Sequence, residues 1–331
     1  MKKTAIIGCG SISHVHARAL RNMEHAELVA VCDIDSGKME SLSQHADCQV
    51  MMTTDWHKLC DMDVDVVHIC TPHYLHAEMA VELLQHGKAV FMEKPCAISR
   101  EQFEQLKQAD EKHPGNLGFC FQNRYNDTTQ AINKMIKEGL IGDVIGARAF
   151  VTWRRDEEYY SVSDWKGRWN TEGGGVLINQ SIHTLDLMLN YLGKPQLVKA
   201  TMSNHHLEEN IQVEDTVEAW LSFENGKRAC FYASNGYVTD APVILEVQGE
   251  QGTITLNGLQ ITIWTPQKGA ELISFEQRQD TGKTYWGYGH EVCIREFYDC
   301  LIQNREFSEN IRGVENSFDA MMQIYEAAGK K

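Results

Sequence analysis

Gly8 and Gly10 lie two residues apart at the end of a short apolar run, in the segment Gly8-Cys9-Gly10-Ser11-Ile12-Ser13. A helical pattern begins directly after this segment. Gly8 allows a tight turn, and Gly10 lets the backbone approach a pyrophosphate whose charge lies at the helix N-terminus. Ser13 stands where a third glycine is usual and is small enough for close packing of helix on strand. The spacing predicts a loop that binds a dinucleotide.

Asp33 strengthens this prediction, because it ends the next apolar run, 25 residues beyond Gly8. A carboxylate at this place can accept hydrogen bonds from the adenosine ribose hydroxyls. A 2′-phosphate would meet a like charge there, and the next residue, Ile34, offers no positive charge to hold it. The sequence therefore favours NAD over NADP as the cofactor. The alternative is a glycine turn followed by a helix-capping aspartate.

Lys94 follows the apolar run Ala89–Met92, where a buried strand would end. Ligands of open α/β sheets bind at the carboxyl ends of the parallel strands. From there Lys94 could donate a hydrogen bond to a reacting hydroxyl or lower the pKa of that hydroxyl. A surface lysine paired with Glu93 is the alternative, but the position and the proline that follows favour a functional lysine.

His183 lies in a helical segment with a stripe of polar residues. At 100° per residue, the residues that fall within an arc of about 60° are Asn179, His183, Asp186 and Asn190. A helix with one wet face explains Asn190. For Asn179 and His183 we favour a cleft, because the three glycines at 173–175 allow close approach of a ligand. His183 could then act as a general base.

Two polar segments could contact a substrate. Tyr159–Trp169 is dense in aromatic and cationic side chains, which suit the apolar faces and the hydroxyls of a carbohydrate. A packed loop core is the alternative for Trp165. Residues 122–125, Gln-Asn-Arg-Tyr, follow the last apolar run of the first half, and we expect them to reach the nicotinamide or the substrate. A polar hinge is the alternative for Arg124.

Short apolar runs and helical patterns alternate over the first 122 residues. The expected strands are 4–7, 28–32, 64–70, 89–92 and 117–121, and the expected helices are 14–23, 38–45, 75–86 and 100–112. The last helix opens with Ser99 and Gln102 in the spacing of a capping box. Apolar strands that alternate with helices predict a parallel sheet covered on both faces, so the fold class is α/β with an N-terminal Rossmann, doubly wound domain.

The pattern changes from residue 123 onward. The expected helices are 129–138, 176–192, 291–303 and 314–328, and the expected strands are 144–153 and several within 196–265. Asn225-Gly226 and Asn257-Gly258 are strong hairpin signals. We therefore predict an NAD-binding domain over 1–122 and an α/β domain with a large, mostly antiparallel sheet over 123–331, joined without a flexible linker.

Composition limits the partners of the chain. The length of 331 residues suggests about two domains. A net charge of −15 argues against nucleic acid or an anionic membrane as a partner, although a locally positive pocket can hold an anionic ligand. The first apolar run ends at Gly8, so we expect neither a signal peptide nor a membrane span. Ten cysteines without a C-x-x-C pair are expected to be reduced, in the cytoplasm.

Four ordered motifs resemble those of the Gfo/Idh/MocA family, over the whole length of the chain. The motifs are the glycine loop, Thr71-Pro72-His73-Tyr74-Leu75-His76, Glu93-Lys94-Pro95 and the segment GGGVLINQSIHTLD at 173–186. Members are NAD(P)-dependent dehydrogenases and related enzymes that act largely on sugars, cyclitols and nucleotide sugars. The resemblance implies a Rossmann domain followed by a domain whose open sheet often serves as the oligomer interface, so we expect a homodimer or homotetramer.

The resemblance and the polar segments together give the expected site residues. Those expected to line the cofactor are Gly8, Gly10, Ser11, Ile12, Asp33, Ile34, Thr71, Pro72, His73, His76, Glu93, Lys94 and Gln122. Those expected to bind the substrate are Asn123, Tyr125, Trp165, Arg168, Trp169, Asn179 and His183.

Lys94, His183 and Asn179 are the expected catalytic residues. The family places the lysine and the histidine at the reacting carbon, with a carboxylate four residues before the histidine. Asn179 departs from that pattern, because an amide can orient a hydroxyl but cannot relay a proton.

We expect no metal site. His14, His16, His73 and His76 lie on separate elements with no carboxylate in ligand spacing, and the pair at 205–206 has no further support. In the family, a histidine at the position of His290 can approach the site.

The expected activity is that of an NAD-dependent dehydrogenase acting on CH–OH groups. Hydride would pass between nicotinamide and a ring hydroxyl of a sugar, nucleotide sugar or cyclitol, and His183 would receive the hydroxyl proton. The alternatives are a dehydrogenase of a non-sugar ring, such as a dihydrodiol, and a non-catalytic sugar or dinucleotide sensor of the same fold. The presence of both Lys94 and His183 argues against the sensor.

Overall fold

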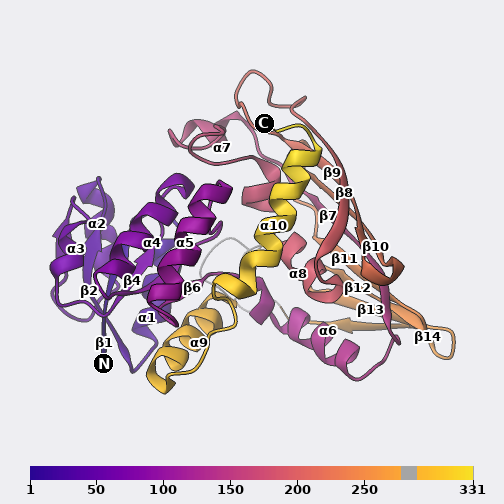
Figure 1. Cartoon of the computed structure of the whole chain (residues 1–331), viewed down its shortest axis with the longest axis horizontal. Coiled ribbons are helices and arrows are strands. Elements are labelled where there is room, and N and C mark those ends of the chain that lie inside the picture. The colour runs from indigo at the N-terminus through magenta and orange to yellow at the C-terminus, as the bar shows by residue number, and fades with distance from the viewer. Residues whose placement is uncertain (277–288, 331) are drawn as a thin grey trace. The chain divides into compact units, whose positions relative to one another are not determined.

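The computed structural model of the chain describes residues 1–276 and 289–330. Contacts between these residues divide the chain into two compact units. The first contains residues 1–125 and the described part of 280–314, and the second contains the described part of 126–279 and residues 315–330. Each unit is built around its own sheet (Figure 1).

The first unit has a six-stranded sheet in the order β3-β2-β1-β4-β5-β6, in which every neighbouring pair is parallel. Its strands are β1 (Lys2–Ile7), β2 (Ala26–Cys32), β3 (Met51–Thr53), β4 (Val66–Ile69), β5 (Ala89–Met92) and β6 (Leu117–Phe119). All residues of β4 and β5 are buried, because helices cover both faces. The predicted Rossmann architecture is confirmed, with β3 as an edge strand beyond the five expected.

The helices of the first unit follow its strands. They are α1 (Ser13–Arg21), α2 (Ser36–Ser43), α3 (Lys58–Asp61), α4 (His76–Gln85), α5 (Arg100–Lys112) and α9 (Gly289–Gln303), with the short 3-10 helices η1 (His73–Leu75) and η2 (Gln122–Tyr125). The N-cap of α5 is confirmed, since Ser99 Oγ accepts a hydrogen bond of 3.3 Å from the Gln102 amide. Gln102 Oε1 in turn accepts from the Ile98 amide over 3.0 Å.

Helix α9 belongs to the first unit although it lies late in the sequence. Phe297 packs on Phe91 of β5 with ring centroids 5.2 Å apart, and the hydroxyl groups of Tyr298 and Thr4 are 2.7 Å apart. All four side chains are buried. The contacts therefore differ from the expected division at 122/123, because α9 completes the core of the first unit.

The second unit has an eight-stranded sheet in the order β14-β13-β12-β11-β7-β10-β9-β8. Its strands are β7 (Val144–Thr152), β8 (Pro195–Ser203), β9 (Thr216–Phe223), β10 (Arg228–Ser234), β11 (Ile244–Gly249), β12 (Gly252–Asn257), β13 (Gln260–Thr265) and β14 (Gly269–Ser274). Only β7 and β10 pair in parallel. Both Asn-Gly turns connect antiparallel strands, β9 to β10 and β12 to β13, as predicted.

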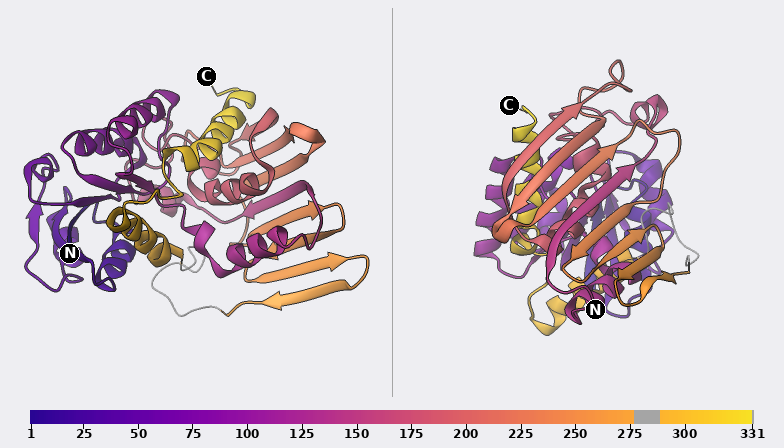
Figure 2. Two further views of the ribbon diagram at one scale, coloured as in Figure 1. Left: turned by 60° about the horizontal axis from the view of Figure 1, so that its bottom comes forward. Right: turned by 90° about the vertical axis from the view of Figure 1, so that its right-hand side faces the viewer.

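One face of this second sheet is covered and the other is open. Along β9, Val217, Ala219 and Leu221 are buried, whereas Glu218 and Trp220 are exposed. Helix α8 (Ile182–Leu192) packs on the covered face against β7 and β11. The open face is turned toward the reader in the right-hand view of Figure 2.

The second unit also contains α6 (Asp127–Lys137), α7 (Glu157–Ser161) and residues 315–327 of α10 (Ile311–Ala327), whose first four residues belong to the first unit. The single helix expected over 176–192 is wrong: a π-helix (Val176–Gln180) precedes α8. Ser181 marks the break, because its amide bonds the carbonyl of Val176, five residues earlier, and its hydroxyl donates to the same carbonyl. None of the described helices combines the length and the apolar composition needed to cross a membrane.

Candidate active site

The glycine loop after β1 has the geometry of a dinucleotide loop. Gly8 has a φ of +86°, and a Cβ there would lie 2.5 Å from the Cys70 carbonyl oxygen, so only glycine fits. Around Gly10, by contrast, a Cβ would meet nothing within 4 Å. The two glycines therefore have different purposes: Gly8 lets the loop after β1 contact the loop after β4, and Gly10 leaves room for a ligand.

Asp33 contacts the glycine loop directly. Its Oδ2 accepts a 2.6 Å hydrogen bond from the Cys9 amide, and its Oδ1 accepts one of 2.9 Å from the Asp35 amide. Ile34 beside it is 93% exposed. The structure thus brings the predicted ribose-binding carboxylate to the loop predicted to hold the pyrophosphate.

Ser11, Ile12 and Ser13 form the start of α1. Ile12 occupies the N-cap position, and no side-chain hydrogen bond caps the helix there. The Ser13 hydroxyl donates to the Gly10 carbonyl over 2.6 Å and so does not cap α1. The backbone amides at this N-terminus can therefore face an anion.

His76 ties two of the predicted cofactor loops together. Its ring nitrogens lie 2.8 Å from the Pro95 carbonyl oxygen and 2.9 Å from the Thr71 carbonyl oxygen. The ring is fully buried. His76 thus has a structural part in placing the Thr71–His76 and Glu93-Lys94-Pro95 segments. Pro72 and the buried His73 lie in the same loop, at η1.

Glu93 is held in a buried ion pair. Its Oε1 lies 3.0 Å from His16 Nε2 and 4.0 Å from His290 Nε2, and its Oε2 accepts from the Lys94 amide over 3.3 Å. Burial would lower the pKa of His16, but its hydrogen bonds with Cys120 and with the Glu93 carboxylate, together with the Glu93 charge, raise it to about 9. His16 is therefore a cation at neutral pH. Burial disfavours the Glu93 carboxylate, yet His16 holds its pKa below the usual range.

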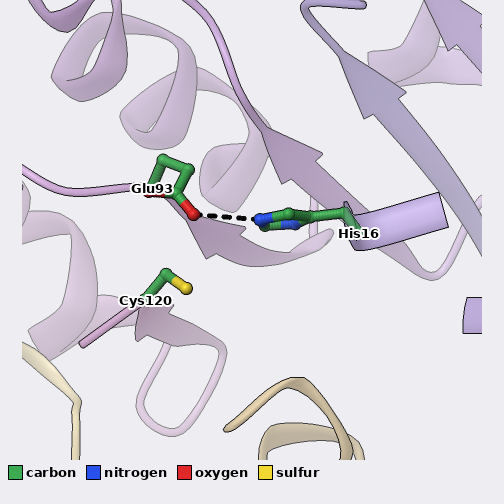
Figure 3. Close-up of side chains that lie close together, drawn as sticks. All are labelled: His16, Glu93 and Cys120. Atoms are coloured by element: carbon green, nitrogen blue, oxygen red, sulfur yellow. Dashed lines mark hydrogen bonds and ion pairs between the residues drawn. The ribbon is translucent and has the colours of Figure 1, made fainter. Parts of the chain in front are cut away.

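His16, Glu93 and Cys120 also bring together three atoms of metal-ligand type, all within 4.8 Å of one another (Figure 3). We expected no carboxylate near these histidines from spacing, and the fold supplies one across 77 residues. The 3.0 Å contact of His16 Nε2 with the Glu93 carboxylate accounts for the arrangement as an ion pair.

His68 extends this buried group and escaped the sequence analysis. Its Nδ1 lies 2.8 Å from His16 Nδ1, and its Nε2 lies 3.0 Å from the Tyr298 hydroxyl. A histidine inside the apolar run 64–70 was the available signal, because a buried polar group needs partners.

Residues 122–125 form η2 after β6. Gln122 is buried. Arg124 donates to the Gly313 carbonyl over 2.9 Å and lies 3.5 Å from Glu309, and both partners belong to the first unit. The Tyr125 hydroxyl donates to the same carboxylate. Contacts of Asn123 and Tyr125 with a substrate stay predictions.

Gly174 and Gly175 pack against their own chain. A Cβ on Gly174 would lie 1.9 Å from the Tyr325 hydroxyl, and one on Gly175 would lie 1.9 Å from the Glu214 carbonyl oxygen. The expectation that these glycines make room for a ligand is therefore wrong for both. They make room for α10 and for the chain before β9.

Glu214, which sequence analysis missed, fixes the segment after the glycines. Its carboxylate accepts hydrogen bonds from the amides of Gly175 and Leu177 and from the Tyr325 hydroxyl, at 2.9, 3.0 and 2.9 Å. The side chain is buried. Glu214 therefore accepts hydrogen bonds from backbone amides at the start of the π-helix, and this helix carries Asn179.

Glu172 is a second buried carboxylate that sequence analysis missed. It accepts a 2.6 Å hydrogen bond from Asn179 Nδ2 and another from the Gly167 amide. The side chain has no exposed area, and burial raises its pKa to about 7. An acidic residue directly before three glycines was the available signal.

His183 and Asp186 lie on a helix that is buried nearly all round. His183 is 9% exposed and Asp186 is 1% exposed, while Asn190 is exposed. Asp186 accepts a 2.5 Å hydrogen bond from Ser317 Oγ. Asn190 is therefore exposed to solvent, as expected. Asp186 is a buried carboxylate with a hydrogen-bond partner.

Some side chains of the Tyr159–Trp169 segment are packed and others are exposed. The Trp169 ring packs edge-on against Tyr325, with centroids 5.7 Å apart, and Lys330 Nζ lies 4.5 Å from the Trp169 centroid. Trp169 thus packs within the second unit, and its role in substrate binding stays a prediction. Trp165 is half-buried and Arg168 is exposed.

Two family models match the chain. Residues 2–119 match the oxidoreductase family with an NAD-binding Rossmann fold, and residues 129–255 match the GFO/IDH/MocA C-terminal domain. The fold and the glycine loop thus define an NAD-dependent oxidoreductase. The chain belongs to the Gfo/Idh/MocA family of these enzymes.

Relatives of known name agree with this assignment. An inositol 2-dehydrogenase from Rhizobium meliloti is 27% identical over 252 residues, which cover 75% of this chain and 73% of the relative. The WlbA dehydrogenase of Bordetella pertussis, solved with NADH and UDP-GlcNAcA, has a TM-score of 0.85 at 25% identity, covering 98% of this chain and 96% of that one. A levoglucosan dehydrogenase, solved with NADH and levoglucosan, shares the fold with a TM-score of 0.88 at 20% identity, covering 99% and 97%.

Proposed function

We propose that the protein transfers a hydride between the nicotinamide of NAD and a ring hydroxyl of a sugar, nucleotide sugar or cyclitol. The observation that carries this proposal is Lys94, which follows β5 at the carboxyl edge of the NAD-binding sheet. Its loop is anchored by Glu93 and by the bond of His76 to Pro95. The names of the inositol, levoglucosan and UDP-GlcNAcA relatives support a cyclic polyol as substrate.

In this proposal a bound cofactor and three side chains have separate roles. The glycine loop and Asp33 would hold NAD, which would supply the hydride acceptor or donor. Lys94 donates a hydrogen bond to the reacting oxygen and favours its alkoxide character. His183 accepts the hydroxyl proton during oxidation and returns it during reduction. Asn179 orients a substrate hydroxyl, since its amide cannot take the proton.

The test is a turnover assay with NAD against a panel of sugars, nucleotide sugars and cyclitols, followed at the absorbance of NADH. Lys94→Ala and His183→Ala should each lower kcat by about 100-fold or more, the scale of a lost general acid or base. Binding of NADH, measured by fluorescence, should stay measurable in both variants. Lys88→Ala is the matched control, because this lysine bonds the Met62 carbonyl before β4. Native turnover in Lys94→Ala would overturn the role of Lys94.

We propose further that two copies of the chain associate through the open face of the second sheet. Large apolar side chains project from this face: Trp220 and Leu197 are 51% and 54% exposed, and Trp264 and Leu272 are 48% and 61% exposed. A patch of this kind marks an interaction surface. The free thiols of all ten cysteines support a reducing, cytoplasmic location for the assembly.

A further inference from the structure

Asn179 presents an amide whose two ends are chemically opposite. Nδ2 is a donor and Oδ1 is an acceptor, and their places exchange when the amide turns over. Which end a substrate meets therefore depends on what holds the other end. The Nδ2 of Asn179 lies 2.6 Å from Glu172 Oε1 and 3.5 Å from the Tyr159 hydroxyl.

Glu172 can hold only one end of that amide while it is ionised. A carboxylate has acceptor atoms only, so it binds Nδ2 and repels Oδ1. Its other oxygen accepts from the Gly167 amide, which fixes the carboxylate in place. The Tyr159 hydroxyl does not decide the orientation, because a hydroxyl can donate as well as accept.

We propose that Glu172 is a positioning residue of the reaction: its carboxylate holds Nδ2 of Asn179, so that Oδ1 is the atom that meets a substrate hydroxyl, and protonation of Glu172 reverses this orientation. A protonated Glu172 gains an O–H donor, which binds Oδ1 and turns Nδ2 toward the substrate. The inference rests on the proposed function, since it names the atom of Asn179 that the substrate meets.

The surroundings of Glu172 place this change near neutral pH. Burial raises the pKa of Glu172 to about 7, and the charge of Glu214 acts in the same direction. The hydrogen bonds from Gly167 and Asn179 and the charge of Lys166 oppose the rise. Glu172 also lies near the hydroxyls of Tyr160 and Tyr325, whose pKa values burial raises well above neutral, so neither is charged. Lys330 Nζ donates to the carbonyl of Gly173 beside it, and the Tyr159 hydroxyl lies 3.5 Å from Asn179 Nδ2. Above neutral pH the carboxylate form dominates, and below it the acid form does.

The experiment compares KM for the sugar or cyclitol substrate at about pH 6 and about pH 8 in four proteins. They are the native enzyme, Glu172→Gln, the exchange variant Glu172→Gln with Asn179→Asp, and Asp164→Asn. The last is the matched control, because Asp164 is an exposed acid of the same loop. Loss of one substrate hydrogen bond changes KM by about 3- to 10-fold.

In the native enzyme and in Asp164→Asn, KM should be about 3- to 10-fold higher at pH 6 than at pH 8. Glu172→Gln should lose the pH dependence. The exchange variant places an acceptor-only carboxylate at 179 and a donor amide at 172, and it should have a native KM at both pH values. A Glu172→Gln enzyme that keeps the native pH dependence of KM would overturn the inference, as would an exchange variant no better than Glu172→Gln.

A second readout does not depend on turnover. The side-chain amide resonances of Asn179, assigned by their loss in Asn179→Asp, should shift with a midpoint near neutral pH in the native protein and should not in Glu172→Gln. A native protein without turnover on any substrate overturns the proposed function, and the resonances then still decide the inference. Resonances that stay fixed across neutral pH in the native protein would contradict it.

Discussion

At the scale of single residues, Asp33 is the predicted source of the preference for NAD. Its carboxylate bonds the Cys9 and Asp35 amides, and an ionised carboxylate has about four acceptor sites in all. Two ribose hydroxyls can therefore bind without displacing the backbone amides. Ile34 projects into solvent beside it, where a cation would have space.

Asp33→Ser combined with Ile34→Arg should shift the preference toward NADP. The lost charged hydrogen bond should weaken NAD by about 10- to 100-fold, and the arginine should bind the 2′-phosphate. The measurement is kcat/KM, or the dissociation constant, for each dinucleotide. Asp35→Asn is the control, since Asp35 caps α2. A double variant that still prefers NAD by the native ratio would show that Asp33 does not select the cofactor.

Local spacing made some residues predictable and left others out. Gly8, Gly10 and Asp33 belong to a short motif and the strand that follows it, so their proximity in space could be predicted from the sequence. The pair of His16 and Glu93 joins residues far apart in the chain, and no pattern along it records their contact. Glu172 was missed because an acid before a glycine turn usually faces water.

The glycine segment before α8 is an element whose shape depends on its neighbours. Gly174 approaches Tyr325 of α10 so closely that no side chain fits between them. Substitution must therefore displace a buried tyrosine that also bonds Glu214.

Gly174→Ala should destabilise the protein by about 1–3 kcal/mol or more, the usual range for overpacking a core. Urea unfolding would measure the loss. Gly37→Ala is the matched control, because a Cβ at Gly37 in α2 meets only an ordinary contact of 3.4 Å, and alanine favours a helix. Equal free energies of unfolding for the two variants would contradict the prediction, because they would show that the chain moves to accommodate a Cβ at Gly174.

Helices and strands were predicted well where the apolar residues keep a single periodicity along the whole segment. The bounds of β5 and α5 agree with those expected, because each is a continuous pattern with clear ends. The π-helix before α8 was not predicted. Its cause is the Ser181 hydroxyl on the Val176 carbonyl and the Glu214 carboxylate on two amides, neither of which alters hydrophobic periodicity.

Association through the open sheet belongs to the scale of the whole molecule. Trp220 lies in the middle of β9, opposite Cys230 of β10 and Lys199 of β8. Trp220→Glu places a charge in the proposed interface, so the oligomer should dissociate at least one step, as measured by light scattering after size exclusion. Val238→Glu is the control, since Val238 is 84% exposed in a loop. A native protein that is monomeric would contradict the proposal.

The late position of α9 has a consequence for synthesis on the ribosome. The aromatic side chains that close the core behind the parallel sheet, Phe297 and Tyr298, leave the ribosome after the entire second sheet has been made. Chains usually fold from the N-terminus as they emerge. Here the core of the first unit stays incomplete during synthesis, because Gly118 and Phe91 lack the Phe297 ring that covers them. The half of the enzyme that is translated first is thus among the last parts to be completed.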